Sequence, residues 1–371
     1  MEIRPILSAL FRNRAGTLLV GLQVALTLAV VANAFYIIEQ RREKMSRPTG
    51  FDSANLFFVQ SYGYSPAYRH EATVRADLAL LRGLPGVADA APIASIPMSG
   101  GGSATVVKAE PGPNSPQHGV NYFDGDERTL DALGLRLVAG RGFRAAEVEY
   151  VADNLDARPK GLLASVATVQ KLFGDVPPAA AVGRQVYLND DTPVTILGVY
   201  ERMMGSWPGI QEPSPYDTVL SPIVQAGPTA RYVVRTRPGE LDRAMALAEQ
   251  RLAASGQGRV ITWVRPHAHA VERAYRSDHR MIVFLGTIVA LMVAVTALGI
   301  VGLATFHVNA RRKQIGTRRA VGARRLDIVR YFLVENGLLS GAGLAVGTLL
   351  AYGFSWWLTS TFQLPPLHPG Y

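Results

Sequence analysis

The chain has 371 residues, 48% of them hydrophobic and 18% charged, and a formal net charge of +9. We interpret this composition as too apolar for an ordinary soluble protein of this size, and we therefore expect membrane-spanning segments. The sequence contains no cysteine, so disulfides, thiol redox chemistry and thiolate metal sites are excluded.

Three runs without charged residues, at 15–38, 281–306 and 336–358, predict transmembrane helices. Each run is long enough to cross a hydrocarbon core about 30 Å thick at 1.5 Å of rise per residue. We assign the three helices to residues 15–40, 281–306 and 331–359.

A cleaved signal peptide is the alternative interpretation of the first run. The apolar region of a signal peptide is only about 7–15 residues long and precedes a small-residue cleavage site. The run at 15–38 is longer and continues into "EQRREK" without such a site. We therefore expect an uncleaved helix behind a cytoplasmic N-terminus of residues 1–14.

The loop 307–330 sets the predicted orientation, because short loops rich in lysine and arginine stay in the cytoplasm. Its basic residues, opposed by Asp327 alone, are Arg311, Arg312, Lys313, Arg318, Arg319, Arg324, Arg325 and Arg330. Residues 41–280 and the tail 360–371 are then periplasmic, in a multi-pass protein of the bacterial inner membrane. No aromatic residue interleaves with the basic ones, so nucleic acid is not an expected partner.

The domain between the first two helices is predicted to be α+β with two lobes. The order strand–helix–strand occurs at its start, in "NLFFVQ", "YRHEATVRADLALLRGLPGV" and "ADAAPIASIPMS", and again at its end, in "ARYVVRTR", "PGELDRAMALAEQRLAAS" and "GRVITWVRP". These units predict a split α/β lobe of residues 50–97 and 228–268 near the membrane. Residues 98–227 form an inserted lobe, in which Asn189–Asp191 is expected to turn a hairpin.

Several motifs together resemble one known family. "LGLRLVAGRGF", "ASVATVQKLFGD" and "VGRQVYLNDDTPVTILGVYERM" follow, in order and spacing, the periplasmic core domain of MacB-like and FtsX-like permeases of ABC transporters. "RRKQIGTRRAVGARRLDIVRYFLVEN" resembles the segment that enters the third helix of these permeases.

The resemblance implies a permease that pairs with a second, identical or homologous permease chain above a cytoplasmic ABC ATPase dimer. Motion of the ATPases would be relayed to the periplasmic domain, where a periplasmic or outer-membrane protein is a further candidate partner. Two features depart from the family: Gln314 replaces a usual Glu, and the fourth membrane helix expected after Pro365 and Pro366 is missing. We expect the 371 residues to be a truncated chain, or a subunit unable to complete its bundle alone.

The basic segment has two interpretations: it marks the cytoplasmic side, or it contacts the ATPase. Thr317 is an acceptable N-cap and Gly322 a good helix end, which predicts a one-turn helix with Arg318 and Arg319 at its unfavourable positive end. Helix stability would then not explain the two arginines, whereas bidentate contacts with carboxylates of a partner would. With the resemblance, the expected ATPase-coupling residues are Gln314, Ile315, Gly316, Thr317, Arg318, Arg319, Ala320, Val321, Gly322 and Ala323. Arg311, Arg312 and Lys313 are expected to serve topology and lipid headgroups.

Small and polar residues in the apolar runs predict close helix packing. The candidates are Gly337 and Gly341, Gly343 and Gly347, and the hydrogen-bonding residues Gln23 and Asn33. Packing within one subunit and packing between subunits both remain open at this point.

No catalytic or cofactor site is expected. The chain lacks a G-x-x-x-x-G-K-[ST] motif, so we expect ATP hydrolysis on a partner chain, and it lacks a G-x-S-x-G motif. We interpret "SGGGSATV" as a flexible connection, and His267 with His269 as part of a polar segment rather than a metal site.

The sequence therefore predicts a non-catalytic permease subunit of export type that relays mechanical work. An FtsX-like regulator of a periplasmic enzyme and a lipoprotein-extracting subunit are the alternatives within the family. A membrane sensor with an extracellular ligand domain is disfavoured, because a third apolar run, not a signalling module, follows the second helix.

Overall fold

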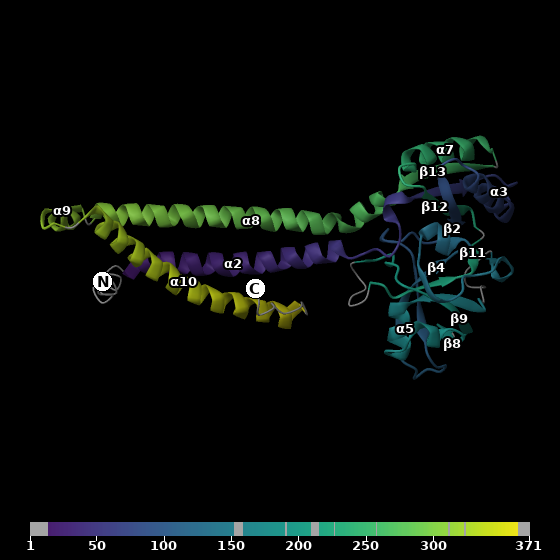
Figure 1. Ribbon diagram of the computed structural model, residues 1–371, viewed down its shortest axis with the longest axis horizontal. Coiled ribbons are helices and arrows are strands. Elements are labelled where there is room, and N and C mark those ends of the chain that lie inside the picture. Colours follow the sequence, from purple (N-terminus) through teal and green to yellow (C-terminus); the bar gives the residue numbers. More distant parts are fainter. Residues whose placement is uncertain are drawn as a thin grey trace. The chain divides into compact units, whose positions relative to one another are not determined.

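The structure is a computed structural model that describes residues 14–151, 159–189, 191–208, 215–225, 227–256, 258–310, 312–322 and 324–362. The chain divides into two compact units, residues 1–47 with 277–371, and residues 48–276. Each unit is considered by itself below, with the element labels of Figure 1.

The first unit consists of helices. They are α2 (Arg14–Ser46), α8 (His267–Ala310, which starts in the second unit), α9 (Arg312–Ala320) and α10 (Arg325–Phe362). Segments Gly21–Ser46 and His267–Ala310 are long and apolar enough to cross a membrane, and α10 contributes a shorter apolar segment, Gly343–Gly353. A membrane location thus rests on two helices, and the third span remains a prediction.

Each long helix extends beyond the range expected from the sequence. α8 begins 14 residues before the apolar run that starts at Met281, and α10 begins at Arg325 inside the expected cytoplasmic loop. The physical reason is that polar, charged segments such as 267–280 contain good helix formers, and an apolar run reports only the lipid-facing part of a helix.

One lobe of the second unit is a four-stranded antiparallel sheet in the order β13–β1–β12–β2. Its strands are β1 (Leu56–Gly63), β2 (Val87–Pro92), β12 (Thr229–Thr236) and β13 (Arg259–Pro266). Helices α3 (His70–Arg82) and α7 (Leu241–Ala254) pack on one face around buried Phe57, Leu81, Tyr232 and Leu252. The expected strand–helix–strand order is confirmed, although β2 ends at Pro92 and α7 starts three residues after Pro238.

The other lobe contains a seven-stranded sheet in the order β5–β9–β7–β10–β4–β3–β8, and β8 also pairs with β9. Its strands are β3 (Ser103–Lys108), β4 (His118–Asp124), β5 (Leu137–Gly140), β7 (Gly161–Ser165), β8 (Gln185–Leu188), β9 (Pro193–Tyr200) and β10 (Thr218–Ser221). The remaining elements are η1 (Ser53–Asn55), η2 (Ala145–Glu147), α4 (Thr129–Leu133), α5 (Val166–Phe173), α6 (Pro178–Ala181), β6 (Glu149–Val151) and β11 (Ile223–Gln225).

Two local predictions in this lobe had different outcomes. The hairpin is confirmed, since β8 and β9 pair antiparallel with Val186 opposite Val194 and Asp191 takes a positive φ of 61° in the turn. The interpretation of "SGGGSATV" as a connection is wrong from Ser103 onward, because β3 begins there and pairs with β4 and β8. The glycines hid a short strand that pairs with the next strand, β4, and with the more distant β8.

Candidate functional site

The basic loop is mostly helical. Gln314, Ile315, Gly316, Thr317, Arg318, Arg319 and Ala320 lie in α9, Val321 and Gly322 form the turn after it, and Ala323 lies outside the described residues. Gly322 has a φ of +100°, a conformation that favours glycine and suits the end of a helix.

The predicted start of this helix is wrong. α9 begins at Arg312, and the hydroxyl of Thr317 donates to the carbonyl oxygen of Lys313 at 3.1 Å, as in a helix interior. Arg318 and Arg319 therefore lie in the last turn of α9, where the helix dipole favours cations by about 0.3–1 kcal/mol each. Helix stability thus accounts for part of their presence, and the argument that only a partner explains them no longer holds.

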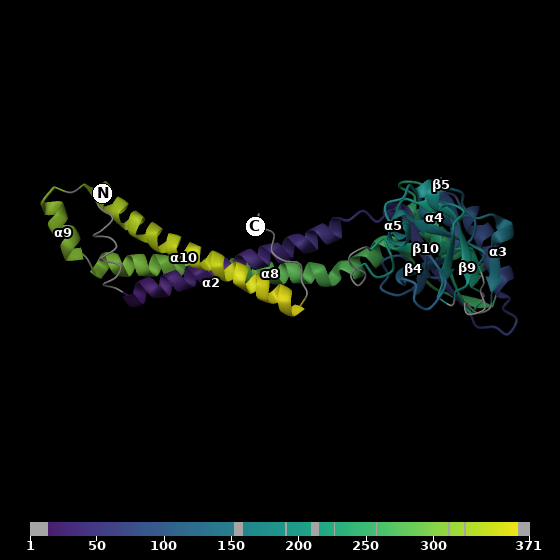
Figure 2. The same ribbon diagram turned by 90° about the horizontal axis from the view of Figure 1, so that it is seen from below.

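Two of the four glycines sit at an interface within the chain. A Cβ atom on Gly343 would meet Gly21 O and Val24 Cβ at 3.0 Å, and one on Gly347 would meet Ala25 O at 2.8 Å. At Gly347 the distance leaves no room for a side chain, and at Gly343 a Cβ would require its neighbours to shift by a few tenths of an ångström, so the glycines let α10 lie close against α2 (Figure 2). Gly337 and Gly341 meet nothing within 4 Å among the described residues.

The two polar candidates lie on α2 and reach different helices. Asn33 Nδ2 donates to Ala29 O at 2.9 Å and to Ala351 O of α10 at 3.4 Å. Gln23 Nε2 donates to Val295 O of α8 at 3.2 Å. One face of α2 therefore contacts α10 while another contacts α8.

Two contacts between α2 and α8 were missed by the sequence analysis. Thr27 and Thr296 share a hydrogen bond of 2.7 Å. Asp278, only 3% exposed, pairs with Arg41 and, at 3.3 Å, with Lys44. The sequence showed these basic residues only as flanking charges, because nothing local signals a partner 237 residues away along the chain.

Strand β13 leads directly into α8, because Pro266 ends the strand and His267 begins the helix. His267 is fully buried, its Nδ1 lies 2.7 Å from Ser53 Oγ, and its Nε2 lies 3.1 Å from Pro97 O. Both ring nitrogens are occupied by protein groups, so His267 serves as an anchor for the start of α8. His267 is packed at this junction, whereas most of the polar segment that follows it is exposed or half-buried.

Two groups of buried charges organise the second unit. Asp77 of α3 and Arg259 of β13, each 1% exposed, form a two-pronged ion pair, and Tyr232 donates to Asp77 Oδ2 at 2.7 Å. Between the lobes, Arg82 of α3 donates to Asp126 Oδ2 at 2.9 Å. This second contact joins the helix of one sheet to the loop after β4 of the other.

The sequence matches two family models in succession. Residues 17–251 match the MacB-like periplasmic core domain, and residues 286–371 match the FtsX-like permease C-terminal domain.

Curated relatives agree with this match. A macrolide export ATP-binding/permease protein MacB 1/2 of Paracoccus denitrificans is 26% identical over 361 residues, which cover 95% of this chain and 50% of that protein. MacB 2 of Aeromonas hydrophila is 24% identical over 94% of this chain and 52% of its own length. The chain thus spans about half the length of these relatives.

Among solved structures, the extracellular domain of the noncanonic ABC-type transporter YknZ from Gram-positive bacteria aligns with 56% of this chain, at 13% identity and a TM-score of 0.34. The family match covers more than half of the chain and confirms the resemblance read from the motifs. The chain belongs to the family of permeases that combine a MacB-like periplasmic core domain with an FtsX-like C-terminal domain.

Proposed function

We propose that the chain is a permease subunit of an export-type ABC transporter and relays ATP-driven motion of a separate ATPase to its periplasmic domain. The observation that carries the proposal is the continuity of α8, whose 44 residues begin directly after the last residue of a sheet strand and end at the basic loop. At 1.5 Å per residue the helix is about 66 Å long, roughly twice the hydrocarbon thickness of a membrane.

A continuous helix transmits displacement better than a flexible linker, because its backbone hydrogen bonds resist bending and stretching. The hydrogen bonds of His267 to Ser53 and Pro97 fix the periplasmic end, so motion of the helix moves the four-stranded lobe. At the other end, α9 lies between α8 and α10 along the chain and is the segment that a partner can push.

The partner proposed for α9 is an acidic groove on a dimeric ABC ATPase. Its contacts are Gln314 to Ala323, with Arg318 and Arg319 as the charged residues that bind carboxylates. A second permease chain completes the membrane assembly, and a periplasmic or outer-membrane protein receives the motion. The same relay would serve an FtsX-like regulator or a lipoprotein-extracting subunit, which differ only in what the periplasmic domain contacts.

Co-purification tests this proposal. The intact chain, tagged and extracted from its native membrane in mild detergent, should bring down a P-loop ATPase and a permease chain in comparable amounts. A matched preparation that lacks the segment 311–325 controls for non-specific capture. Recovery of the chain with a sensor kinase or with no ATPase would contradict the proposal.

A further inference from the structure

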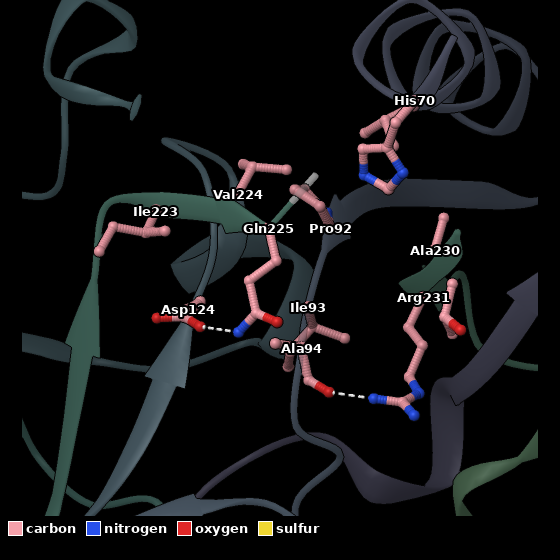
Figure 3. A pocket seen from close by; sticks show the side chains of 12 residues that line it. His70, Pro92, Ile93, Ala94, Asp124, Ile223, Val224, Gln225, Ala230 and Arg231 are labelled. Atoms are coloured by element: carbon pink, nitrogen blue, oxygen red, sulfur yellow. Dashed lines mark hydrogen bonds between the residues drawn. The ribbon is translucent and has the colours of Figure 1, made fainter. Parts of the chain in front are cut away.

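Two neighbouring cavities lie along the seam between the two sheets of the second unit. The first, of about 260 Å³, is shown in Figure 3, and the second measures about 470 Å³. Both are lined by Ala94, Gln225 and Arg231, so they meet at these residues. We call the larger one the seam cavity; its lining residues are Gln60, Ala94, Ser95, Ile96, Ser99, Gly101, Gly102, Ser103, Gln225, Arg231 and Trp263.

Arg231 of β12 is the only charged residue that lines the seam cavity within the described part of the chain. Its Nε donates to Gln60 Oε1 at 2.8 Å. Its Nη1 donates to Ala94 O at 2.5 Å (Figure 3). These two bonds fix the plane of the guanidinium group. Nη2 makes no hydrogen bond to a described residue, so its donors remain available to a ligand.

Several arginines of this domain have a carboxylate partner: Arg259 pairs with Asp77, Arg82 with Asp126, and Arg141 with Glu147. No described acidic side chain forms an ion pair with Arg231, and burial lowers the pKa of its guanidinium. A desolvated, unpaired cation is costly, and a bound anion would remove that cost.

The remaining lining of the seam cavity suits an anion with an apolar body. Ser95 lines the cavity, and its hydroxyl accepts from Ser103 N at 3.1 Å, which leaves its own proton to donate to a ligand; the Ser99 hydroxyl already donates to Gly101 O at 2.8 Å. Ile96 and Trp263 give an apolar wall, and the indole N–H of Trp263 donates to no described residue. Asp124 lines only the smaller cavity, where it accepts from Gln225 at 2.6 Å and disfavours a second negative charge.

We propose that the seam cavity binds an organic acid, with its carboxylate or phosphate on Arg231 and its apolar body against Trp263 and Ile96. The site lies between the two lobes, so an occupant would contact both of them and change how they move relative to one another. The inference uses only contacts within the second unit and does not depend on the ATPase.

Calorimetric titration of the full chain in lipid nanodiscs tests the proposal, with the titration of empty nanodiscs subtracted. The probes are octanoate and octyl phosphate, their short counterparts acetate and inorganic phosphate, and octyltrimethylammonium as the cation of equal length. The two octyl acids should bind, the short anions more weakly, and the cation not at all. Octanoate should also change the fluorescence of the chain, and Trp263→Phe should remove that change.

Arg231→Gln should weaken octanoate binding by about tenfold or more, the loss expected for a charge-assisted hydrogen bond. Arg243→Gln, on the exposed surface of α7, is the matched control and should bind as the wild type. If the glutamine variant does not fold, Arg231→Lys replaces it and should keep the preference for acid over cation. Equal binding by the cation, full affinity in Arg231→Gln, or no binding of either octyl acid would overturn the proposal.

Discussion

At the scale of single residues, the second unit depends on buried charges that must be compensated. Asp77 and Arg259 are 182 positions apart and almost fully buried, and their pairing fixes α3 to β13 next to Tyr232. Neither residue stood out in the sequence, because an aspartate on a helix and an arginine at a strand start are normally solvated. Only the folded structure brings them together.

Arg259→Leu should destabilise the domain by about 3–5 kcal/mol, since it leaves the carboxylate of Asp77 buried without its partner. The double change Asp77→Leu with Arg259→Leu should recover much of this loss. Arg243→Leu, which breaks an exposed pair with Glu240, should cost less than about 1 kcal/mol. Urea unfolding followed by circular dichroism measures all three, and a double variant as unstable as the single one would contradict the account.

His70 gives the domain a predictable response to acid. Its Nε2 is buried without a hydrogen-bond partner among the described residues, and burial lowers the pKa of His70. A lowered pKa means that the unfolded state binds the proton more readily. The contribution of His70 to stability is therefore present above the ordinary histidine pKa of about 6.5 and is lost as the pH falls below it.

His70→Gln should make the melting temperature of the full chain less dependent on pH below about 6.5 than that of the wild type. The comparison of wild type and variant at each pH isolates this one residue, because all other titrating groups are shared. Differential scanning calorimetry in nanodiscs supplies the measurement. Parallel melting curves across this range would show that His70 does not contribute.

At the scale of elements, the sequence predicted whether a segment is a helix or a strand better than it predicted the first and last residues of that segment. Apolar runs and helical periodicity identified the strands and helices of the four-stranded lobe, because β1 is a largely buried strand and α3 and α7 each bury one face. The start of α9 was placed at Thr317 because threonine caps helices well, but the same hydroxyl also bonds to the carbonyl four residues back inside a helix. The sequence alone does not distinguish these two uses.

The glycine repeats are a second feature for which the sequence alone does not distinguish two possibilities. Sequence spacing marked Gly337 with Gly341 and Gly343 with Gly347 as equivalent, whereas only the second pair lies against α2. Which face of α10 meets α2 depends on how the helices are rotated about their axes, and that follows from the whole bundle. Gly337 and Gly341, which meet nothing within 4 Å among the described residues, remain candidates for contact with a second chain.

A disulfide between Val24→Cys and Gly343→Cys should form within one chain on oxidation, because the two Cβ positions are 3.0 Å apart and a small shift brings them to the separation of about 3.5–4.5 Å found in disulfides. The natural sequence has no cysteine, so the cross-link has no competitors. Val24→Cys with Gly341→Cys is the matched control and should stay reduced. Mass spectrometry distinguishes the outcomes, and a cross-link that joins two chains instead would show that α10 packs on a neighbour.

At the scale of the whole molecule, the proposed orientation follows from the basic loop between α8 and α10. An alkaline phosphatase reporter, active only in the periplasm, should be active when fused after Gly205 and silent when fused after Ala323. A cytoplasmic reporter at the same two positions is the control and should give the opposite pattern. The reverse result would place the core domain in the cytoplasm and remove the basis for the relay.

The central claim is that α9 receives the motion of an ATPase, and charge reversal tests it most directly. Arg318→Glu with Arg319→Glu removes the proposed contacts, while Arg311→Glu with Arg312→Glu makes the same charge change in the same loop. Both variants keep six lysine or arginine residues in the loop 307–330, so both should insert normally.

The measurement is ATP turnover by the co-purified ATPase, together with the amount of ATPase retained by each variant. The account predicts that the change at 318 and 319 weakens ATPase binding by about tenfold or more and abolishes permease-dependent turnover, since buried charge pairs cost about 2–5 kcal/mol when broken. The change at 311 and 312 should leave both nearly intact. Undiminished binding and turnover in the 318 and 319 variant would contradict the account and reduce the basic loop to a topology signal.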